Sequence, residues 1–436
     1  MSNFKSKLSD KTAVIGVVGL GYVGLPLAVE AAKAGFAVIG IDVSSEKCEM
    51  LSRGENYIGD VKDSDLRDAL SSGKLRAVTD FSEVSKTDFV CIAVPTPLDI
   101  HQQPDISYVK SSCESILAYL HKDMAIILES TTYPGTTEEL LLPMFESTGL
   151  KCGDDFHLAF SPERVDPGNQ HYNTGNTIKV VGGVTPECTD IAAAMYESIL
   201  NAPIHKVSSP AVAEMEKILE NAYRNVNIGL INELAILCNR MSISIWEVID
   251  AAKTKPYGFH AFYPGPGLGG HCIPLDPYYL SWKAREFGFH TSMIETSMVV
   301  NDGMPEYCVM RASRVLNKDK KALNGSKILL LGVAYKQDID DYRESPALRV
   351  YKILRREGAD VCFYDPFVAE FRNGEGTVAG ESNLTPELLQ SVDLVMITTG
   401  HTNVDYDLVA EHSKAIFDTR NAMKNVAGDR LNIEVL

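Results

Sequence analysis

The sequence contains no long hydrophobic run, and none of its apolar stretches approaches the length that a membrane-spanning helix needs. Residues 1–7 lack the apolar core of a signal peptide, so we expect a cytoplasmic protein that does not bind membranes. Basic charge is also scarce. The formal net charge of -17 argues against general nucleic-acid binding and against an anionic membrane surface as partner. A negatively charged ligand must therefore be bound by local clusters of Lys, Arg and backbone amides.

No pair of cysteines has the Cys-x-x-Cys spacing, although the chain contains nine cysteines. The odd number in so long a chain favours reduced thiols over a disulfide framework. Most of these cysteines are expected to be small buried apolar residues, and no metal ion is expected. With 436 residues, of which 45% are hydrophobic and 23% charged, the chain is long enough for two or three globular domains.

The first part of the chain has the pattern of a βαβ unit followed by further buried strands. The predicted elements are a strand at 13–18, a helix at about 26–34, and strands at 37–42, 89–94, 125–128 and 157–160. Helical stretches separate the later strands. Strands that alternate with helices are typical of a doubly wound parallel sheet.

A long helical pattern separates this region from a second α/β pattern. It runs from about Ser209 to Arg240 and is followed by another helix at 245–252. The second pattern consists of strands at 327–332, 361–365, 394–398 and 415–418 and a helix at 346–357. We therefore predict an α/β protein with two Rossmann-like doubly wound parallel-sheet domains joined by a long central helix. The expected domains are 1–205, 206–315 and 316–436, and dimerisation through the central helix is a further hypothesis.

The glycines of Gly19-x-Gly21-x-x-Gly24 lie between the first predicted strand and the first predicted helix. In a dinucleotide-binding turn the first glycine makes the tight turn, the second lets the backbone approach the pyrophosphate, and the third allows close helix packing. Asp42 ends the second strand, where a carboxylate accepts hydrogen bonds from the adenosine ribose and repels a 2′-phosphate. The pattern favours NAD over NADP. A glycine-rich turn without a ligand is the alternative.

Polar residues follow several predicted strands, at the edge where open α/β sheets bind ligands. They are residues 94–97 (Val-Pro-Thr-Pro), 129–132 (Glu-Ser-Thr-Thr) and 161–164 (Ser-Pro-Glu-Arg). Plain turns are the alternative for each segment, but their recurrence at successive strand ends favours a site.

On the long helix, Lys217, Asn221 and Asn225 share one face because they are four residues apart. A lysine and an amide that project together are candidates for hydrogen bonding to a developing oxyanion. A solvated helix face is the usual explanation of such a set, and the spacing alone does not decide between the two.

Residues 265–276 read Gly-Pro-Gly-Leu-Gly-Gly-His-Cys-Ile-Pro-Leu-Asp, so Cys272 follows four glycines. Glycines let the backbone approach a ligand closely, and His271 and Asp276 are near in sequence. A thiolate can add to an aldehyde to give a thiohemiacetal, whose oxidation gives a thioester that water hydrolyses. Combined with an NAD site, Cys272 indicates oxidation of an alcohol through an aldehyde to an acid. An inert cysteine is the alternative.

In these motifs the chain resembles the UDP-glucose/GDP-mannose dehydrogenases, which are nucleotide-sugar 6-dehydrogenases. The resemblance runs nearly end to end and covers six motifs in the family's order. They are Gly19-x-Gly21-x-x-Gly24, Val94-Pro95-Thr96-Pro97, Ser161-Pro162-Glu163, Lys217-x-x-x-Asn221, Gly269-Gly270-x-Cys272-x-Pro274-x-Asp276 and Gly332-x-Ala334-Tyr335-Lys336, the last continuing into Asp341-x-Arg343-Glu344-Ser345-Pro346.

The resemblance implies a four-electron oxidation that consumes two NAD and one water and converts the C6 hydroxyl of a UDP-sugar to a carboxylate. It assigns NAD binding to residues 1–205, dimerisation and the cysteine loop to 206–315, and UDP-sugar binding to 316–436. A homodimer or a higher homo-oligomer is expected.

The resemblance also implies roles for single residues. Cys272 would be the nucleophile, Lys217 and Asn221 would stabilise the oxyanion, and Asp276, with Thr131 and Glu163, would position or activate water. The residues implied to contact NAD are Gly19, Gly21, Tyr22, Val23, Gly24, Asp42, Lys47, Pro95, Thr96, Thr131 and Arg343. The residues implied to contact the substrate are Glu163, Arg164, Val165, Lys217, Asn221, Tyr257, Tyr263, Gly265, Gly269 and Lys336.

The sequence departs from the common UDP-glucose enzymes at several positions. His271, Ile273 and Leu275 replace their Ser, Phe and Lys, Pro256 stands where many members have an arginine, and residues 163–168 differ. These variants resemble the subgroup that acts on UDP-N-acetylhexosamines. We expect UDP-N-acetylglucosamine as substrate, in the synthesis of a surface polysaccharide such as the lipopolysaccharide O-antigen. UDP-N-acetylmannosamine, UDP-N-acetylgalactosamine and UDP-glucose are alternatives, as is a catalytically silent module that binds NAD or a nucleotide sugar.

Overall fold

The computed structural model describes residues 2–165, 169, 171–270, 272–374, 376–427 and 431–436. They form two compact units: unit 1 is Met1–Glu220 with Tyr278–Phe289, and unit 2 is Asn221–Pro277 with His290–Leu436. His271 and residues 166–168, which distinguish the sequence from the UDP-glucose enzymes, lie outside the described residues. In the described part of the chain, no helix combines the length and the apolar character that crossing a bilayer requires.

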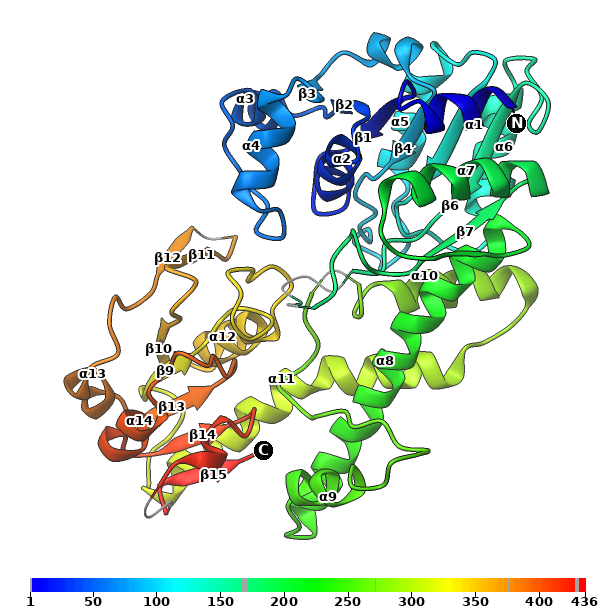
Figure 1. Cartoon of the computed structure of the whole chain (residues 1–436). Coiled ribbons are helices and arrows are strands. Elements are labelled where there is room, and N and C mark those ends of the chain that lie inside the picture. Colours follow the sequence, from blue (N-terminus) through cyan, green and yellow to red (C-terminus); the bar gives the residue numbers. More distant parts are fainter. Residues whose placement is uncertain (1, 166–168, 170, 271, 375, 428–430) are drawn as a thin grey trace. The chain divides into compact units, whose positions relative to one another are not determined.

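An eight-stranded sheet organises unit 1 (Figure 1), with the strand order β3-β2-β1-β4-β5-β6-β7-β8. The strands are β1 Val14–Val18, β2 Ala37–Ile41, β3 Leu75–Val78, β4 Phe89–Ile92, β5 Met124–Leu128, β6 Phe156–Phe160, β7 Lys179–Gly183 and β8 Ile204–Lys206. All neighbouring pairs are parallel except β6 and β7, which are antiparallel. The order from β3 to β6 is that of a doubly wound dinucleotide-binding sheet.

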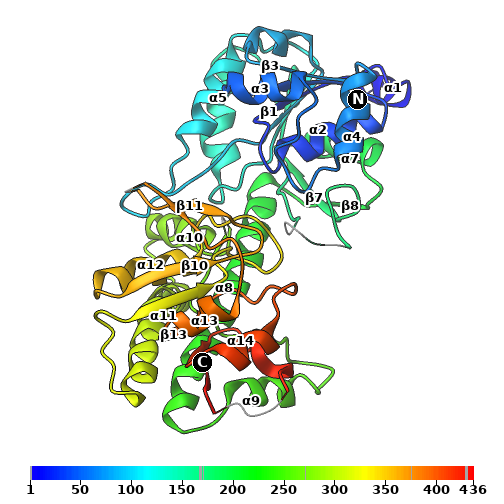
Figure 2. The same cartoon turned by 90° about the vertical axis from the view of Figure 1, so that its left-hand side faces the viewer.

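Both faces of this sheet are covered by helices, so successive residues of a strand enter different cores. Ile15 and Val17 pack in one apolar cluster with α1, α2, α4 and α7, whereas Val18 packs in a second cluster with α5 and α6. Figure 2 shows helices on both sides of the strands. The helices of unit 1 are α1 Ser2–Ser9, α2 Gly24–Lys33, α3 Ser45–Ser52, α4 Asp63–Ser71, α5 Ser107–Leu117, α6 Leu142–Glu146 and α7 Pro186–Ile199. Burial on both faces explains the continuous apolar runs of these strands.

Unit 2 contains a second, smaller sheet of five parallel strands in the order β10-β9-β13-β14-β15. Its strands are β9 Lys327–Leu331, β10 Asp360–Tyr364, β13 Leu394–Ile397, β14 Ile416–Asp418 and β15 Ile433–Val435, with a separate hairpin of β11 Glu370–Arg372 and β12 Thr377–Ala379. Helices α11 Ser292–Lys318 and α12 Pro346–Arg356 cover one face. Helices α13 Pro386–Ser391 and α14 Tyr406–His412 cover the other. The predicted α/β fold class with two doubly wound sheets is confirmed.

Among the described residues the remaining α-helices are α8 Pro210–Arg240, α9 Ile245–Ala252 and α10 Asp276–Ala284. Helix α8, of 31 residues, starts in unit 1 and ends in unit 2. Its predicted limits, and those of α9, agree with the structure to within a residue. The predicted three-domain boundaries stay a prediction.

The sequence patterns missed several elements of the two units. The strands β3, β7, β8 and β15 were not predicted, nor was the 27-residue helix α11, which contains Pro305. Strand β4 ends at Ile92, two residues before its predicted end. The short strands are only three to five residues long, too short for a two-residue alternation to stand out.

Gly229 lies where α8 meets α11 in unit 2. A Cβ atom at Gly229 would lie 2.8 Å from the Cβ of Ser297 on α11. Gly303, on α11, is exposed, and a Cβ atom there would meet nothing within 4 Å. The two glycines are thus a matched pair in which only one is required by packing.

We predict opposite effects of alanine at these two positions. Gly229→Ala should lower the free energy of unfolding by about 1–3 kcal/mol because the helices must separate. Gly303→Ala should raise it by about 0.5–1 kcal/mol because alanine favours the helix. Urea titrations followed by circular dichroism measure both. Equal stability of Gly229→Ala and the wild type would contradict the close helix crossing.

Candidate active site

The turn between β1 and α2 in unit 1 needs two of its three glycines for its own packing. Gly19 has a φ of 91°, and a Cβ atom there would lie 2.5 Å from the carbonyl oxygen of Ala93. A Cβ atom at Gly24 would lie 1.8 Å from the carbonyl oxygen of Gly19. At Gly21 a Cβ atom would meet nothing within 4 Å. The open space at Gly21 fits a pyrophosphate that approaches the backbone at the start of α2.

Asp42, directly after β2, is buried beside this turn. Its Oδ2 accepts hydrogen bonds from the backbone N–H of Leu20, at 2.8 Å, and from Nζ of Lys47, at 3.2 Å. Its Oδ1 accepts the backbone N–H of Ser44 at 2.9 Å. The structure therefore brings together the turn, Asp42 and Lys47, and a carboxylate in this place suits the ribose hydroxyls of NAD.

We predict that Gly21→Ala folds normally but binds NAD poorly. The new methyl group enters open space, so the free energy of unfolding should change by less than about 0.5 kcal/mol. The same methyl group should raise the Kd for NAD by about tenfold or more, since it obstructs the backbone approach. Calorimetric titration with NAD and thermal denaturation measure the two effects. Gly24→Ala is the contrasting variant and should lose stability. Undiminished NAD affinity of Gly21→Ala would contradict the assignment.

In unit 1, hydrogen bonds connect the polar residues that follow β4 to those that follow β5. The hydroxyl of Ser130 accepts the N–H of Val94 at 2.9 Å and donates to the carbonyl oxygen of Val94 at 2.8 Å. The hydroxyl of Tyr279 donates to the carbonyl oxygen of Thr96. Thr131 is half-buried. These bonds hold the segment containing Pro95 and Thr96 against the end of β5.

A buried ionic cluster occupies the same edge. Nζ of Lys179 lies 2.8 Å from Oε2 of Glu129 and 3.3 Å from Oε2 of Glu163. The hydroxyl of Tyr196 donates to Oε1 of Glu129 at 2.6 Å. Oε1 of Glu163 accepts the backbone N–H groups of Arg164 and Val165 at 2.8 and 2.9 Å. Glu163 belongs to a sequence motif and was predicted, whereas Lys179 belongs to no motif and was not predicted.

The charges in this cluster control the protonation of Glu163. Burial by itself raises the pKa of a carboxyl group, but the ammonium of Lys179, the two backbone N–H groups and the charge of Lys217 outweigh it and lower the pKa of Glu163. Burial opposes the charge of Lys179 as well, and the carboxylates of Glu129 and Glu163 outweigh it, which raises the pKa of Lys179. Glu163 is therefore an anion at neutral pH, and Lys217 lies within electrostatic reach of it.

Arg164 is engaged by helix α8 within unit 1. Its Nη2 lies 2.5 Å from Oε1 of Glu220 and its Nε lies 3.3 Å from Oε1 of Glu216. Burial, followed by the charge of Glu220, raises the pKa of Glu216 to about 7. The ion pairs fix the backbone of residues 163–165, which carries Glu163 and Val165, beside the helix.

In unit 2 two asparagines of α8 hold the ends of the glycine-rich segment. Nδ2 of Asn225 donates to the carbonyl oxygen of Ile273 at 3.0 Å, and Oδ1 of Asn232 accepts the N–H of Gly265 at 3.1 Å. The side chain of Asn301 on α11 bonds to both asparagines. Asn232 was missed by sequence analysis, although its spacing along α8 continues the series that starts at Lys217.

Cys272 and Asp276 lie at the end of this segment. Nδ2 of Asn221 donates to Oδ2 of Asp276 at 2.5 Å, and the backbone N–H of Asp276 donates to the carbonyl oxygen of Cys272 at 2.9 Å. Of the nine cysteines, all within the described residues, only Cys272 is exposed. Lys217, Asn221 and Asn225 are buried, at 7%, 6% and 1% exposure, so the alternative of a solvated helix face is wrong.

Two glycines of this segment are required by protein packing. A Cβ atom at Gly265 would lie 2.4 Å from Nη1 of Arg420, and one at Gly269 would lie 2.7 Å from the Cβ of Tyr335. The sequence suggested that the glycines let the backbone approach a ligand. In the structure these two positions face protein atoms.

The second sheet repeats the arrangement of the first at its corresponding turn. Gly332 follows β9 with a φ of 86°, and Oδ2 of Asp365, after β10, accepts the N–H groups of Val333 and Ala334 at 2.7 and 3.0 Å. Nε2 of the fully buried His401 lies 3.0 Å from the same oxygen. Burial raises the pKa of Asp365, but the bond to His401 and the backbone N–H groups outweigh it and lower that pKa. Sequence analysis did not identify Asp365 or His401 as functional candidates.

Four other predicted ligand contacts belong to unit 2: Arg343, Lys336, Tyr257 and Tyr263. Arg343 forms a two-bond pair with Asp341, at 2.9 and 2.8 Å. Lys336 is half-buried and Tyr257 is exposed. Tyr263 stacks on Trp246 with ring centroids 6.0 Å apart.

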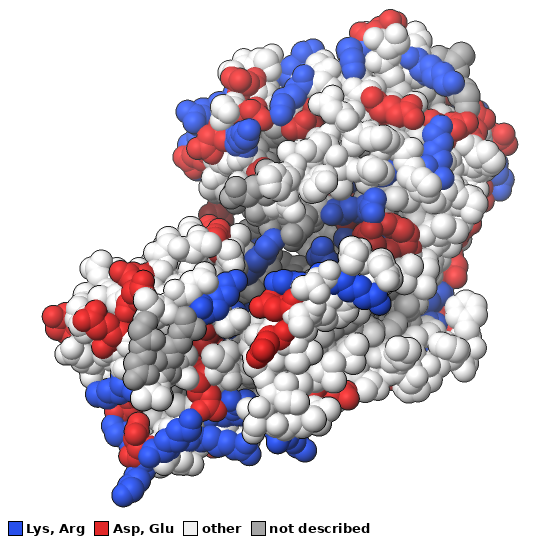
Figure 3. Space-filling view, turned by 60° about the horizontal axis from the view of Figure 1, so that its bottom comes forward, with Lys and Arg blue, Asp and Glu red and all other residues white. Residues whose placement is uncertain are grey.

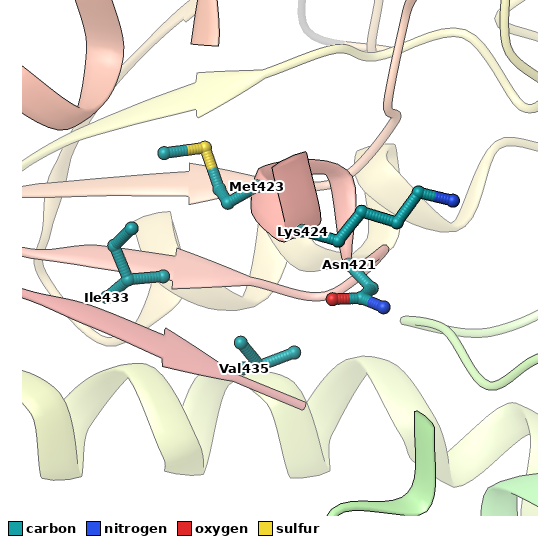
Figure 4. Close-up of a pocket in the computed structure, with 5 residues that line it drawn as sticks. All are labelled: Asn421, Met423, Lys424, Ile433 and Val435. Carbon is teal, nitrogen blue, oxygen red and sulfur yellow. The ribbon is translucent and has the colours of Figure 1, made fainter. Parts of the chain in front are cut away.

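The surface charge and the small pocket beside β15 do not indicate a further ligand-binding site. Figure 3 shows Lys and Arg side chains interspersed with Asp and Glu on the face that it draws. A pocket of about 80 Å³ between the turn at Ala422–Asn425 and β15 is lined by side chains that include Met423 and Ile433 (Figure 4). The described residues contain no cluster of three or more His, Cys, Asp or Glu side chains that could hold a metal ion.

Three family models match the chain in succession. They are described as the NAD binding domain (residues 13–200), the central domain (211–303) and the UDP binding domain (329–425) of the UDP-glucose/GDP-mannose dehydrogenase family. The matches agree with the motifs that carried the resemblance.

Individual relatives differ in the sugar that they are named for. UDP-N-acetyl-D-glucosamine 6-dehydrogenase of Pseudomonas aeruginosa is 38% identical over 360 residues, which cover 82% of this chain and 84% of that protein. UDP-N-acetyl-D-mannosamine dehydrogenase of Pyrococcus horikoshii is 33% identical over 418 residues, 94% of this chain and 96% of that one. A solved structure of the Pyrococcus horikoshii UDP-N-acetylmannosamine enzyme has a TM-score of 0.88 at 32% identity, covering 97% of this chain and 98% of that chain.

Proposed function

Because the chain belongs to the UDP-glucose/GDP-mannose dehydrogenase family of NAD-dependent UDP-sugar 6-dehydrogenases, we propose that it oxidises a UDP-N-acetylhexosamine to the uronate at C6. The first candidate substrate is UDP-N-acetylglucosamine. The observation that carries the proposal is Cys272, an exposed thiol adjoining the buried Asn221–Asp276 pair in the family's cysteine motif. We further propose a cytoplasmic role in surface-polysaccharide synthesis.

NAD supplies a hydride acceptor for each of the two oxidations. The C6 hydroxyl loses a hydride and a proton to become an aldehyde, and the Cys272 thiolate adds to C6 to give a thiohemiacetal. Loss of a second hydride, with the hydroxyl proton, leaves a thioester. Water then cleaves the carbon–sulfur bond, which gives the carboxylate and restores the thiol. Cys272 keeps the aldehyde from escaping between the two oxidations.

The other side chains bind the oxyanion on C6 or orient the water in these reaction steps. Lys217 and Asn221, one helical turn apart on α8, donate to the oxyanion on C6. Asp276, whose orientation is fixed by Asn221, and Glu163 with Thr131 orient the hydrolytic water. Lys336 binds the nucleotide part of the substrate and Arg343 contributes to the NAD site.

We predict that Cys272→Ala loses uronate formation but keeps NAD binding. Without the thiol no thioester forms, so kcat for the acid product should fall by about 10³-fold or more. The wild type should yield two NADH per sugar, measured by NADH absorbance against product quantified by mass spectrometry. Cys362→Ala, a half-buried thiol bonded to the carbonyl oxygen of Ile328, is the matched control. Normal turnover of Cys272→Ala, or one NADH per sugar, would contradict the mechanism.

The choice of sugar is supported by the names of the relatives. The Pseudomonas aeruginosa enzyme, named for UDP-N-acetylglucosamine, has the higher identity, whereas the Pyrococcus horikoshii enzyme, named for UDP-N-acetylmannosamine, matches over more of the chain. The two sugars differ only in the configuration of the acetamido group at C2. UDP-N-acetylmannosamine is therefore the second candidate.

A panel of UDP-sugars tests this choice. Initial NADH formation is measured with UDP-N-acetylglucosamine, UDP-N-acetylmannosamine, UDP-N-acetylgalactosamine and UDP-glucose, and kcat/KM is compared. The highest kcat/KM for UDP-N-acetylglucosamine is expected. A higher value for an epimer would reassign the substrate, and binding of NAD and sugar without any NADH would favour a silent binding module.

We also propose that α8 forms the interface of a homodimer or a higher homo-oligomer. One face of α8 is apolar and exposed, and it includes Val212, Leu219, Leu230 and Leu237, of which Leu219 is 60% exposed. The spacing places this face opposite the polar residues Lys217 to Asn232. In unit 1 a groove of about 590 Å³, lined mainly by apolar side chains such as Met215 and Phe287, extends it. An exposed apolar stripe of this length marks an interaction surface.

Charged residues in the stripe should dissociate the assembly. The double variant Leu230→Glu/Leu237→Glu should shift the mass in light scattering toward the 47.8 kDa of one chain, because burying two carboxylates opposes association. Ile100→Glu, an exposed apolar residue of unit 1 outside α8, is the control and should leave the mass unchanged. A wild type of 47.8 kDa at working concentration would contradict the proposal.

A further inference from the structure

The antiparallel strand β7 places a cation at the edge of the sheet where β5 and β6 end. Residues of β6 and β7 pair as Ala159 with Gly183 and Phe160 with Gly182. Because the strands run in opposite directions, the first residue of β7, Lys179, lies beyond the end of β6. The hydroxyl of Ser161, which donates to the carbonyl oxygen of Val180 at 2.8 Å, fixes this register. A parallel strand in the same place would begin at the opposite edge.

The ammonium of Lys179 is almost completely buried and lies between two carboxylates. Each oxygen of Glu129 accepts a hydrogen bond, one from Lys179 and the other from Tyr196, and Glu129 lies directly after β5. Glu129 thereby holds Lys179 in place from one side. On the other side Lys179 contacts Oε2 of Glu163, whose Oε1 is already bound by two backbone N–H groups.

A buried cation between the buried carboxylate of Glu129 and the partly exposed carboxylate of Glu163 is a costly arrangement if it contributes only to stability. Ion pairs in the interior recover their desolvation cost only in part, and apolar residues of similar volume often replace them without loss. The cluster has a clear effect on Glu163, because both oxygens of Glu163 are fixed in direction and its negative charge is retained. Glu163 lies in the Ser-Pro-Glu motif, and Lys217 is within electrostatic reach of it.

We propose that Lys179 is a positioning residue that keeps the Glu163 carboxylate ionised and correctly oriented during turnover, with Glu129 and Tyr196 as its support. This inference rests on the proposed function, in which Glu163 orients the hydrolytic water. Glu163 then acts as a fixed anionic acceptor, and Lys179 itself touches neither substrate nor NAD. The charged groups that act on Glu163 are Lys179, Lys217 and the guanidinium of Arg164, together with the backbone N–H groups of Arg164 and Val165, and Glu129 lies behind Lys179.

The test separates this positioning role from a merely structural one. Lys179→Met leaves the buried Glu129 carboxylate and the neighbouring Glu163 carboxylate without their cation, which favours unfolding. The informative variant is therefore Lys179→Met/Glu129→Gln, compared with Glu129→Gln alone. Glu163→Gln is the reference for a lost carboxylate, and Lys179→Arg is the conservative replacement. Circular dichroism and NAD binding check that each variant folds.

The readout is the fraction of enzyme that carries the acyl group on Cys272 during turnover, measured by acid quenching and intact mass spectrometry across pH 6 to 9. Glu163→Gln should accumulate the acyl enzyme at every pH. The double variant should accumulate it at low pH and lose it as the pH rises. Removing the positive charge of Lys179 raises the pH at which Glu163 ionises, so the acidic limb of the kcat profile should move to higher pH. Lys179→Arg should restore the wild-type profile.

A folded double variant with the profile and acyl fraction of Glu129→Gln would overturn the proposal, as would a defect that is independent of pH. A second arm needs no turnover. An infrared titration of the double variant should show a protonated carboxyl band that persists to higher pH than in Glu129→Gln and that is absent from the double variant carrying Glu163→Gln in addition. If the wild type makes no NADH with any UDP-sugar, the proposed function fails. The infrared band still decides whether Lys179 controls the ionisation of Glu163.

Discussion

Most of the candidate site depends on helix α8, because the buried face of this helix carries polar side chains that need hydrogen-bond partners. One face presents Lys217, Asn221, Asn225 and Asn232, whose polar atoms would be costly to bury without partners. In unit 2 those partners are Asp276 and the backbone of the glycine-rich segment. The segment that carries Cys272 is therefore held by hydrogen bonds to one helix, and Cys272 stays exposed in a segment whose backbone is fixed.

The parallel sheet of unit 1 imposes a second constraint. Strands that are buried on both faces have no room for polar side chains except at their ends. Glu129 and Ser130 accordingly follow the end of β5 and Glu163 follows the end of β6, and the charge of the buried Glu129 must be balanced. Lys179 supplies the balance from the antiparallel strand. The negative charge of Glu163 at this edge therefore depends on the positive charge of Lys179.

The two sheets share a turn that combines a glycine of positive φ with an aspartate after the next strand. In unit 1 Asp42 binds the N–H of Leu20, and in unit 2 Asp365 binds the N–H groups after Gly332. The aspartates thus stabilise the turns themselves in addition to any ligand. An acidic residue in this position therefore carries both structural and binding information, and the sequence motif alone does not separate the two.

The sequence by itself determined the βαβ turn and the limits of α8 and α9, and it singled out Cys272 as the candidate nucleophile, because these depend on local spacing. Three glycines in a fixed pattern, an uninterrupted helical period and Cys272 in its motif are all contained in short windows of the chain. Tertiary structure decided the rest: the reversed direction of β7, the buried pairing of Lys179, the role of Asn232 and the packing of Gly265 and Gly269 against side chains distant in sequence. These contacts join residues that are far apart in the chain, and periodicity does not report which strands become neighbours or in which direction they run.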